Sequence, residues 1–478
     1  MVFIGAMAGM FIGAIPGLSV SMATALLVSV TYSWSTEHAL ATIMGVYVVG
    51  VYSGAISAIL INIPGAPSSV VTTLDGYPLA QKGEAYKALK YATFYSFIGS
   101  LFGFTALGVF AGPISNIALK FTPMDYFLLA IFGLTTVGSL TGKIFTKGLI
   151  SAAIGLVVSM VGIDSVLGIP RLTFGIYGLQ TGINIVPVLI GLFGLSEVLI
   201  IVSEGRLESE VLNIAKTKVP IREMFRYFFR SLYYCTIGTF VGVLPGVGGP
   251  IASFLAYGEA KRIKKDTPVP FGEGQIEGIV ASESANNACI GGALIPMLTL
   301  AVPGDAVTAI ILSVFYVHGL QPGPMFIKSN PHMFYAIFAG GLIGSVFLLL
   351  LGLFMGPNIG KVVTIPKRIL MPVIIVLCIV AAFAYNNRLF DVTLMFLFGI
   401  TGFIMRRRNY PAAPMILAIV LGGMMDSNFR RAVSLASSEE RFFVALFGRP
   451  ITIILTFLII FVVVSNVPQL RRLMKNDH

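Results

Sequence analysis

The chain has 478 residues, of which 56% are hydrophobic and only 11% are charged; an ordinary soluble domain carries about 25% charged residues. So few charges cannot cover a soluble fold, and the apolar runs are too long for the alternating strands of a membrane β-barrel. The net charge of +11 comes from short basic loops, which are typical of the cytoplasmic side of a membrane protein. We therefore predict an all-α polytopic membrane protein.

Apolar runs separated by short polar loops predict membrane segments along the chain. The predicted segments are residues 2–31, 37–62, 86–112, 124–140, 144–163, 183–204, 231–260, 276–300, 303–320, 333–355, 369–385, 390–405, 411–425 and 450–467. A helix needs about 20 apolar residues to span the bilayer, so we expect about 10–12 crossings, with the remaining runs forming re-entrant or broken helices.

One long polar connection, residues 205–230, divides the chain. We predict a first membrane repeat at 1–204, and a second repeat with C-terminal helices at 231–478. The end of the connection, Ile221–Arg230, is basic and aromatic, which is typical of an amphipathic segment at the membrane surface. The positive-inside rule places this linker in the cytoplasm. It places the other basic loops there too, namely Lys82–Lys90, Lys143–Lys147, Lys261–Lys265, Arg406–Arg408 and Arg471–Lys475.

The two halves share a repeated pattern of Pro-Gly pairs. Gly13–Ser19 resembles Gly242–Gly248, and a second pair follows in each half, at Pro64-Gly65 and at Pro303-Gly304. All four pairs lie within apolar runs, in the same order. Two halves with interrupted helices at matching positions are typical of secondary transporters with inverted repeats and a site near the membrane midplane. We also expect a Gly-Pro turn after each second pair, at residues 75–78 and 318–322.

The segment 231–260 is broken near its centre, and neither arm is long enough to cross the membrane. Each arm flanking Leu244–Pro250 has about 11 residues, or about 16 Å at 1.5 Å per residue, against a hydrocarbon core of about 30 Å. Basic residues flank both ends, so we predict a re-entrant hairpin with both ends in the cytoplasm, and an inverted counterpart at residues 2–31. A single broken spanning helix is the alternative, and opposite labelling of residues 228 and 264 would favour it.

Each Pro-Gly break begins a new half-helix, whose N–H groups and dipole attract anions. Glycines at the tips let the backbone approach a ligand closely. We therefore predict substrate binding at the two tips and the two second breaks, by Pro16, Gly17, Ser19, Pro64, Gly65, Gly246, Gly248, Gly249, Pro303 and Gly304. The alternative is that the Pro-Gly pairs only kink packed helices.

Uncharged polar residues near these breaks extend the predicted substrate site. They are Asn62, Ser68, Ser69, Ser284, Asn286 and Asn287. Amides and hydroxyls can bind a carboxylate or, through oxygen, a cation. The alternative is that the same groups form hydrogen bonds between helices with no ligand. If they bind substrate, Asn287→Ala should weaken binding about 10- to 150-fold, whereas wild-type transport by both Asn286→Ala and Asn287→Ala would place the site elsewhere.

Three intramembrane carboxylates are candidates for coupling to a cation: Asp75, Glu283 and Asp305. Asp305 has an equally good alternative, because it can interact with the dipole of the helix that it begins. The four histidines match no metal spacing, and no catalytic pair is present. We therefore expect no enzymatic activity, no bound metal and no cofactor, with Na⁺ or H⁺ as the coupling ion.

Taken together, these motifs resemble the large transmembrane subunit of the tripartite tricarboxylate transporter (TctA) family, over most of the chain. The strings that carry the resemblance are Gly13–Gly17, Tyr52–Gly65, Thr73–Gly83, Gly242–Ala252, Phe271–Gly278, Glu283–Asn287, Gly291–Pro296, Val302–Gly304 and His318–Pro324. Asp305 departs from the family pattern, because a small neutral residue is more usual at that position.

The resemblance implies a multi-pass protein of the cell inner (cytoplasmic) membrane. It implies two partners, a small membrane subunit and a periplasmic or surface solute-binding protein. The implied activity is cation-coupled uptake of carboxylates such as citrate-like acids. A carboxylate channel or passive pore is the main alternative, and a binding or scaffold protein is the third.

Overall fold

The computed structural model describes residues 1–15, 18–140, 145–164, 168–204, 219–263, 268–359, 367–436 and 446–466. Almost all of the described elements are helices, and β1 (Gly162–Ile163) and β2 (Pro170–Arg171) form one short antiparallel pair. Within this part of the chain, six helices are long and apolar enough to cross a membrane, and shorter apolar helices accompany them. The predicted fold class, an all-α polytopic membrane protein, is confirmed.

The first repeat begins with two short helices that form a hairpin against a long one. Its elements are α1 (Val2–Ala14), α2 (Val20–Val30), α3 (Thr36–Ile61), η1 (Pro67–Ser69) running into α4 (Val70–Leu79), η2 (Ala80–Glu84) and α5 (Ala85–Ala118). Along α1, Gly5 packs on Thr42 of α3 and Gly13 packs on Gly50 and Ser53, so α1 runs parallel to α3. Since α2 must return to the start of α3, α1 and α2 enter and leave on one side.

The second repeat is built in the same way. Its elements are α12 (Phe228–Val243), α13 (Gly248–Ile263), α14 (Ile276–Leu300), α15 (Ala306–Val317), α16 (Phe326–Ser329) and α17 (Pro331–Ile359). Gly238 and Gly242 of α12 pack on Ala285 and Cys289 of α14, so these two helices are parallel. Helix α13 is antiparallel to α14, because Gly249 contacts Asn286 whereas Ser253, one turn later, bonds to the carbonyl of Ser282. The hairpin therefore replaces the alternative of one broken spanning helix.

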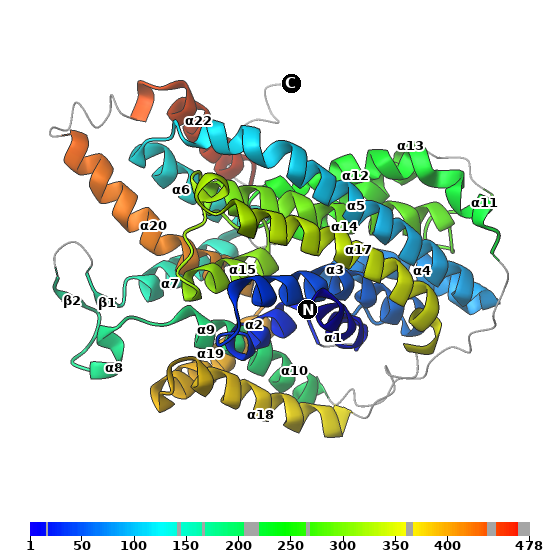
Figure 1. The fold of residues 1–478 in the computed structure, drawn as a ribbon, viewed down its shortest axis with the longest axis horizontal. Helices are drawn as coiled ribbons and strands as arrows, with labels where there is room; N and C mark the ends of the chain where they lie inside the picture. The colour runs from blue at the N-terminus through cyan, green and yellow to red at the C-terminus, as the bar shows by residue number, and fades with distance from the viewer. Residues whose placement is uncertain are drawn as a thin grey trace.

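The two repeats are inverted relative to each other. Helix α5 runs parallel to α14, with Gly99 on Ser284 and Gly103 on Ala288. Helix α17 runs parallel to α3, and α5 and α17 are antiparallel, since Phe104 packs on Gly341 and Thr93 on Gly352. Helices α3 and α14 are consequently antiparallel. Figure 1 shows α3, α5, α14 and α17 side by side along the long axis of the molecule.

The remaining helices flank this core in two groups. One group contains α6 (Pro123–Leu140), α7 (Phe145–Ser159), α20 (Ala412–Ala436) and α22 (Pro450–Asn466). The other contains α9 (Ile185–Leu189), η3 (Ile190–Leu195), α10 (Ser196–Glu204), α18 (Lys367–Asn386) and α19 (Leu389–Arg407). Each group mixes helices from both halves of the chain, on the left side and the lower side of Figure 1. Three short elements, α8 (Tyr177–Gln180), α11 (Ile221–Met224) and η4 (Phe225–Tyr227), complete the described chain.

Two local predictions need correction. The hairpin arms α12 and α13 have 16 residues each rather than about 11, because the helices extend into the basic flanks. Residues 75–78 are not a turn but part of α4, whereas the predicted turn after α15 is present, with Gly319 at φ 71°. In the first repeat the chain bends later, at Gly83, which has φ 84° within η2. The domain boundaries at 204 and 230 stay predictions, and residues 205–218 lie outside the described residues.

Candidate functional site

A cavity of about 670 Å³ lies where the two hairpin tips meet the two second breaks. Four helices begin at its wall: α2, the η1–α4 helix, α13 and α15. Among the residues predicted from the sequence to bind substrate or cation, those lining the cavity are Ser19, Pro64, Gly65, Ser68, Gly246, Gly248, Gly249, Asn286 and Asp305. Helix N-termini carry unpaired N–H groups and partial positive charge, so this arrangement favours an anion in the cavity.

The second breaks have the same backbone geometry in both repeats. Asn62 ends α3 and Ala301 ends α14, each at φ 57° in the left-handed region. The glycine that follows then packs on the hairpin tip of its own repeat. A Cβ on Gly65 would lie 2.2 Å from the carbonyl oxygen of Gly13, and a Cβ on Gly304 would lie 2.5 Å from that of Gly242. Both positions therefore require glycine, and the contact ties each second break to its hairpin.

On one part of the wall, the η1–α4 helix begins without a side-chain cap. We call Ser68, Gly249 and Asn286 the uncapped cluster. Ala66 is the N-cap residue of η1, and no side chain there accepts a hydrogen bond from the first backbone N–H groups. Asn286 is 1% exposed, yet neither its amide oxygen nor its amide nitrogen has a hydrogen-bond partner within the described residues. A Cβ at residue 249 would lie 2.3 Å from the Asn286 Oδ1, so glycine there makes room for the amide. Such a buried unpaired amide is costly unless a ligand binds it.

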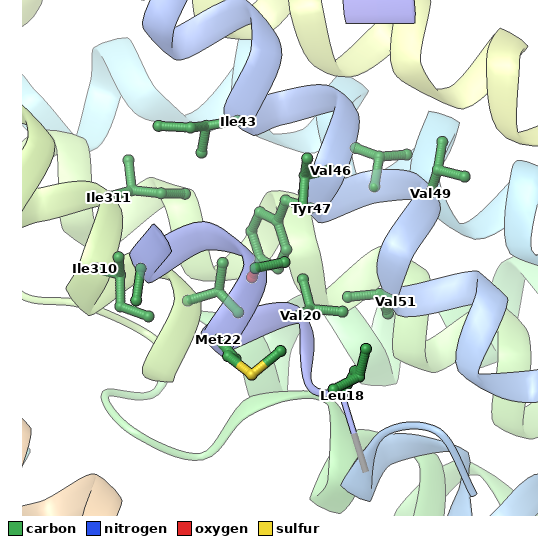
Figure 2. Packing of buried hydrophobic residues seen from close by; sticks show 14 of the residues in the cluster. Leu18, Val20, Met22, Ile43, Val46, Tyr47, Val49, Val51, Ile310 and Ile311 are labelled. Carbon is green, nitrogen blue, oxygen red and sulfur yellow. The ribbon is translucent and has the colours of Figure 1, made fainter. Parts of the chain in front are cut away.

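On another part of the wall the helix start is capped by a carboxylate. We call Tyr47, Asp305 and Thr308 the capped cluster. Asp305 Oδ1 accepts from the backbone N–H of Thr308 at 2.7 Å, and Asp305 Oδ2 accepts from the Tyr47 hydroxyl at 2.5 Å. Figure 2 shows Tyr47 among Val20, Met22 and Ile310, its ring enclosed by apolar side chains of the neighbouring helices. Of the two alternatives for Asp305, the structure shows the helix-capping one directly.

Several predicted site residues lie away from the cavity. Glu283 is buried and accepts from the Thr72 hydroxyl at 2.5 Å and the Ser96 hydroxyl at 2.8 Å. Asn287 accepts from Ser100 at 3.3 Å and donates to the carbonyl of Glu283 at 3.2 Å. These bonds join α14 to α4 and α5, which is the interhelical alternative for Asn287.

Asp75 joins the repeats in a different way. One of its carboxylate oxygens accepts from three backbone N–H groups in the loop before α14, those of Gly272, Gly274 and Gln275, at 2.7–2.9 Å. The predicted residues that do not line the cavity are Asn62, Ser69, Asp75, Glu283, Ser284, Asn287, Pro303 and Gly304. Pro16 and Gly17 lie outside the described residues. Substrate binding by any of the predicted residues stays a prediction.

Polar residues of the cavity wall that were not predicted from the sequence as site residues include Ser21, Tyr47, Glu197 and Arg406. Arg406 pairs with Glu197, so the cavity has a cation at its wall, already partnered by a carboxylate. The sequence held a signal for Tyr47, because the register of the Pro-Gly pairs aligns it with Asn286. It held no comparable signal for Arg406, which comes from the flanking helix α19.

Comparisons with known proteins find a matching family and similar proteins. The family model described as "Tripartite tricarboxylate transporter TctA family" matches residues 1–417. The chain is 36% identical over 450 residues to an uncharacterized 52.8 kDa protein of the TAR-I ttuC' 3' region of Agrobacterium vitis, covering 92% of this chain and 88% of that protein. It is 39% identical over 210 residues to an uncharacterized protein of the TAR-II ttuC' 3' region of the same organism, covering 43% of this chain and 85% of that one. No solved structure matches the chain.

Proposed function

Because this chain belongs to the tripartite tricarboxylate transporter TctA family, we propose that it carries organic carboxylates across the membrane through the cavity between its two hairpins. Family membership makes it a multi-pass membrane component of a transporter and not an enzyme. The cation gradient as driving force, the carboxylate as substrate and delivery by a solute-binding protein are the proposed parts.

One observation carries the proposal. Four helix N-termini line a single cavity, of which those of α2 and α15 are capped by Ser19 and Asp305, and a buried amide without a partner among the described residues, that of Asn286, faces it. N–H donors and partial positive charge at helix starts suit a carboxylate without a dedicated lysine or arginine. Arg406, the cation among the described lining residues, is already paired with Glu197. The binding energy for the substrate charge therefore comes from dipoles and hydrogen bonds.

A coupled cation offsets the remaining negative charge. Among the three candidate carboxylates, Asp75 and Asp305 each have an oxygen that accepts from backbone N–H groups, and the partial positive charge of these donors disfavours a cation there. Glu283 instead contacts the hydroxyls of Thr72 and Ser96, and these hydroxyls can turn so that their oxygens coordinate Na⁺ or accept a hydrogen bond from the protonated carboxyl group. Glu283 is therefore our candidate for the coupling site, with Na⁺ or H⁺ as the ion.

The family is a tripartite system, so a small membrane subunit and a solute-binding protein belong to it. We propose that both act with this chain in the inner membrane, the binding protein on the outer side. The basic segments then face the cytoplasm, according to the positive-inside rule.

Uptake into proteoliposomes tests the proposal. The vesicles contain this chain and its small subunit, and the solute-binding protein is added outside with radiolabelled citrate, succinate or 4-hydroxybutyrate. We expect accumulation above the outside concentration only under an imposed Na⁺ or H⁺ gradient, and its loss when an ionophore removes that gradient. Flux that stops at equal concentrations would instead identify a passive pore.

A further inference from the structure

The two repeats place different groups at equivalent positions in the cavity. The register set by Pro64-Gly65 and Pro303-Gly304 aligns Ala66 with Asp305. The same register aligns Tyr47 of α3 with Asn286 of α14, and all four residues line the cavity. The capped and uncapped clusters are therefore the same site in two copies of one fold.

In the capped cluster the anion position is filled by the protein itself. The Asp305 carboxylate lies at the start of α15, where it accepts from the Thr308 backbone N–H and side-chain hydroxyl and from the Tyr47 hydroxyl. The position of this carboxylate shows that the repeat can hold an anion at the helix start. The anion there is contacted by Tyr47 of the first repeat.

Beside the uncapped cluster, the residue equivalent to Asp305 is Ala66, whose side chain supplies no carboxylate. The equivalent of Tyr47 is Asn286, which is 1% exposed and has both amide atoms without a partner in the described part of the chain. The helix that begins at Pro67 continues through α4, so its dipole is substantial. A ligand carboxylate there would bring the negative charge that Asp305 brings in the other repeat. The Ser69 N–H, equivalent to that of Thr308, already donates to the Ala66 carbonyl at 3.0 Å, so the Asn286 amide and the helix dipole would hold the ligand.

We propose that the cavity binds a ligand carboxylate at the uncapped cluster, and that Asp305 selects against a second carboxylate at the capped cluster. The preferred substrates are organic acids with one carboxylate and a neutral group, such as a hydroxyl, at the other end. This inference rests on the proposed function, since it names the substrate class of the same cavity. Two carboxylates facing each other in a partly buried site repel, which gives the selectivity its physical basis.

A matched pair of probes tests the selectivity. Succinate and 4-hydroxybutyrate have the same chain length but differ in having a carboxylate or a hydroxyl at one end. Their apparent affinities are measured on the purified full chain, as the concentration that gives half-maximal thermal stabilisation. The variant is Asp305→Asn, because asparagine caps helices as well as aspartate and keeps an oxygen acceptor. Thr308→Ala is the control, since it weakens the same cap but keeps the charge of Asp305.

We expect wild type to prefer 4-hydroxybutyrate. Asp305→Asn should raise the affinity for succinate relative to 4-hydroxybutyrate at least about tenfold, and Thr308→Ala should leave the ratio unchanged. Asn286→Ala should weaken the binding of both probes. If wild type prefers succinate, or Asp305→Asn does not change the ratio while Asn286→Ala weakens both, the selectivity is wrong but the site stands. If neither probe stabilises wild type or any variant, the proposed site itself is wrong.

Discussion

Asn286 and Asn287 are neighbours in sequence but face different surroundings. Consecutive residues of a helix point about 100° apart, so one amide faces the cavity and the other faces α5. Asn286 has no partner among the described residues, whereas Asn287 contacts Ser100 and the carbonyl of Glu283. Substitutions at these two positions should therefore affect different quantities, carboxylate binding at Asn286 and stability at Asn287.

We predict that Asn286→Ala weakens carboxylate binding about 10- to 150-fold, the equivalent of one lost hydrogen bond to a charged group. Its melting temperature should stay at or above that of wild type, because removing an unpaired buried amide relieves a desolvation penalty. Thermal unfolding and ligand titration of the purified protein measure both quantities. A lower melting temperature with unchanged binding would show that Asn286 is structural.

The matched substitution Asn287→Ala should behave in the opposite way. It leaves the Ser100 hydroxyl without its acceptor and removes a bond within α14, so we expect a loss of about 1–3 kcal/mol of stability. Carboxylate affinity should change little in the folded fraction. From the sequence alone the two residues could not be distinguished. The sequence shows two adjacent amides but not which neighbouring helix or cavity each amide faces.

At the scale of elements, the sequence predicted the breaks better than the helices around them. The cluster of prolines and glycines at 245–250 predicts a break because these residues are costly in a helix interior, and the short arms with basic flanks favour a hairpin there. Residues 75–78 carry a similar signal but lie within α4, where tertiary packing overrides the local turn preference. The close helix contacts could not be predicted, because a glycine in an apolar run does not reveal which helix it meets.

Helices α5 and α14 approach through glycines, and this contact joins the two repeats. A Cβ on Gly291 would lie 2.1 Å from the backbone of Gly103, so a side chain must push the helices apart. We predict that Gly291→Ala destabilises the protein by about 1–3 kcal/mol, as overpacking usually does. Thermal unfolding in detergent measures the effect.

Gly112 of α5 is the control for this contact, since a Cβ there would meet nothing within 4 Å. Gly112→Ala should be neutral or slightly stabilising, because alanine favours a helix. Equal melting temperatures for the Gly291 and Gly112 variants would contradict the predicted role of the α5–α14 contact.

At the scale of the molecule, the inverted repeats predict the sidedness of the hairpins. The open end of the α12–α13 hairpin should face the cytoplasm, and that of the α1–α2 hairpin the opposite side, because α3 and α14 are antiparallel. Single cysteines at Arg226 and Lys261 should react with an impermeant maleimide only from the cytoplasm, and one at Glu37 only from outside. Labelling of all three from the same side would contradict the inversion.

The repeat was predictable from sequence because the Pro-Gly pairs recur in the same order, and its inversion because basic residues flank the hairpin at 231–260 but not that at 2–31. The exchange of helices between repeats was not, since α5 packing on α14 and α17 packing on α3 depend on contacts far apart in the chain. That exchange places both sets of breaks around one cavity. We predict that a carboxylate binds there.

Ligand protection of a cysteine in the cavity tests this claim most directly. Ser21 lines the cavity but belongs to neither cluster, so Ser21→Cys reports occupancy without removing a proposed ligand group. The variant carries alanine at the three native cysteines, and Gln81→Cys, at an exposed position outside the cavity, is the control. We predict that succinate, citrate or 4-hydroxybutyrate slows modification of Ser21→Cys by a small methanethiosulfonate and leaves Gln81→Cys unaffected. Full reactivity of Ser21→Cys in the presence of all three acids would contradict the account.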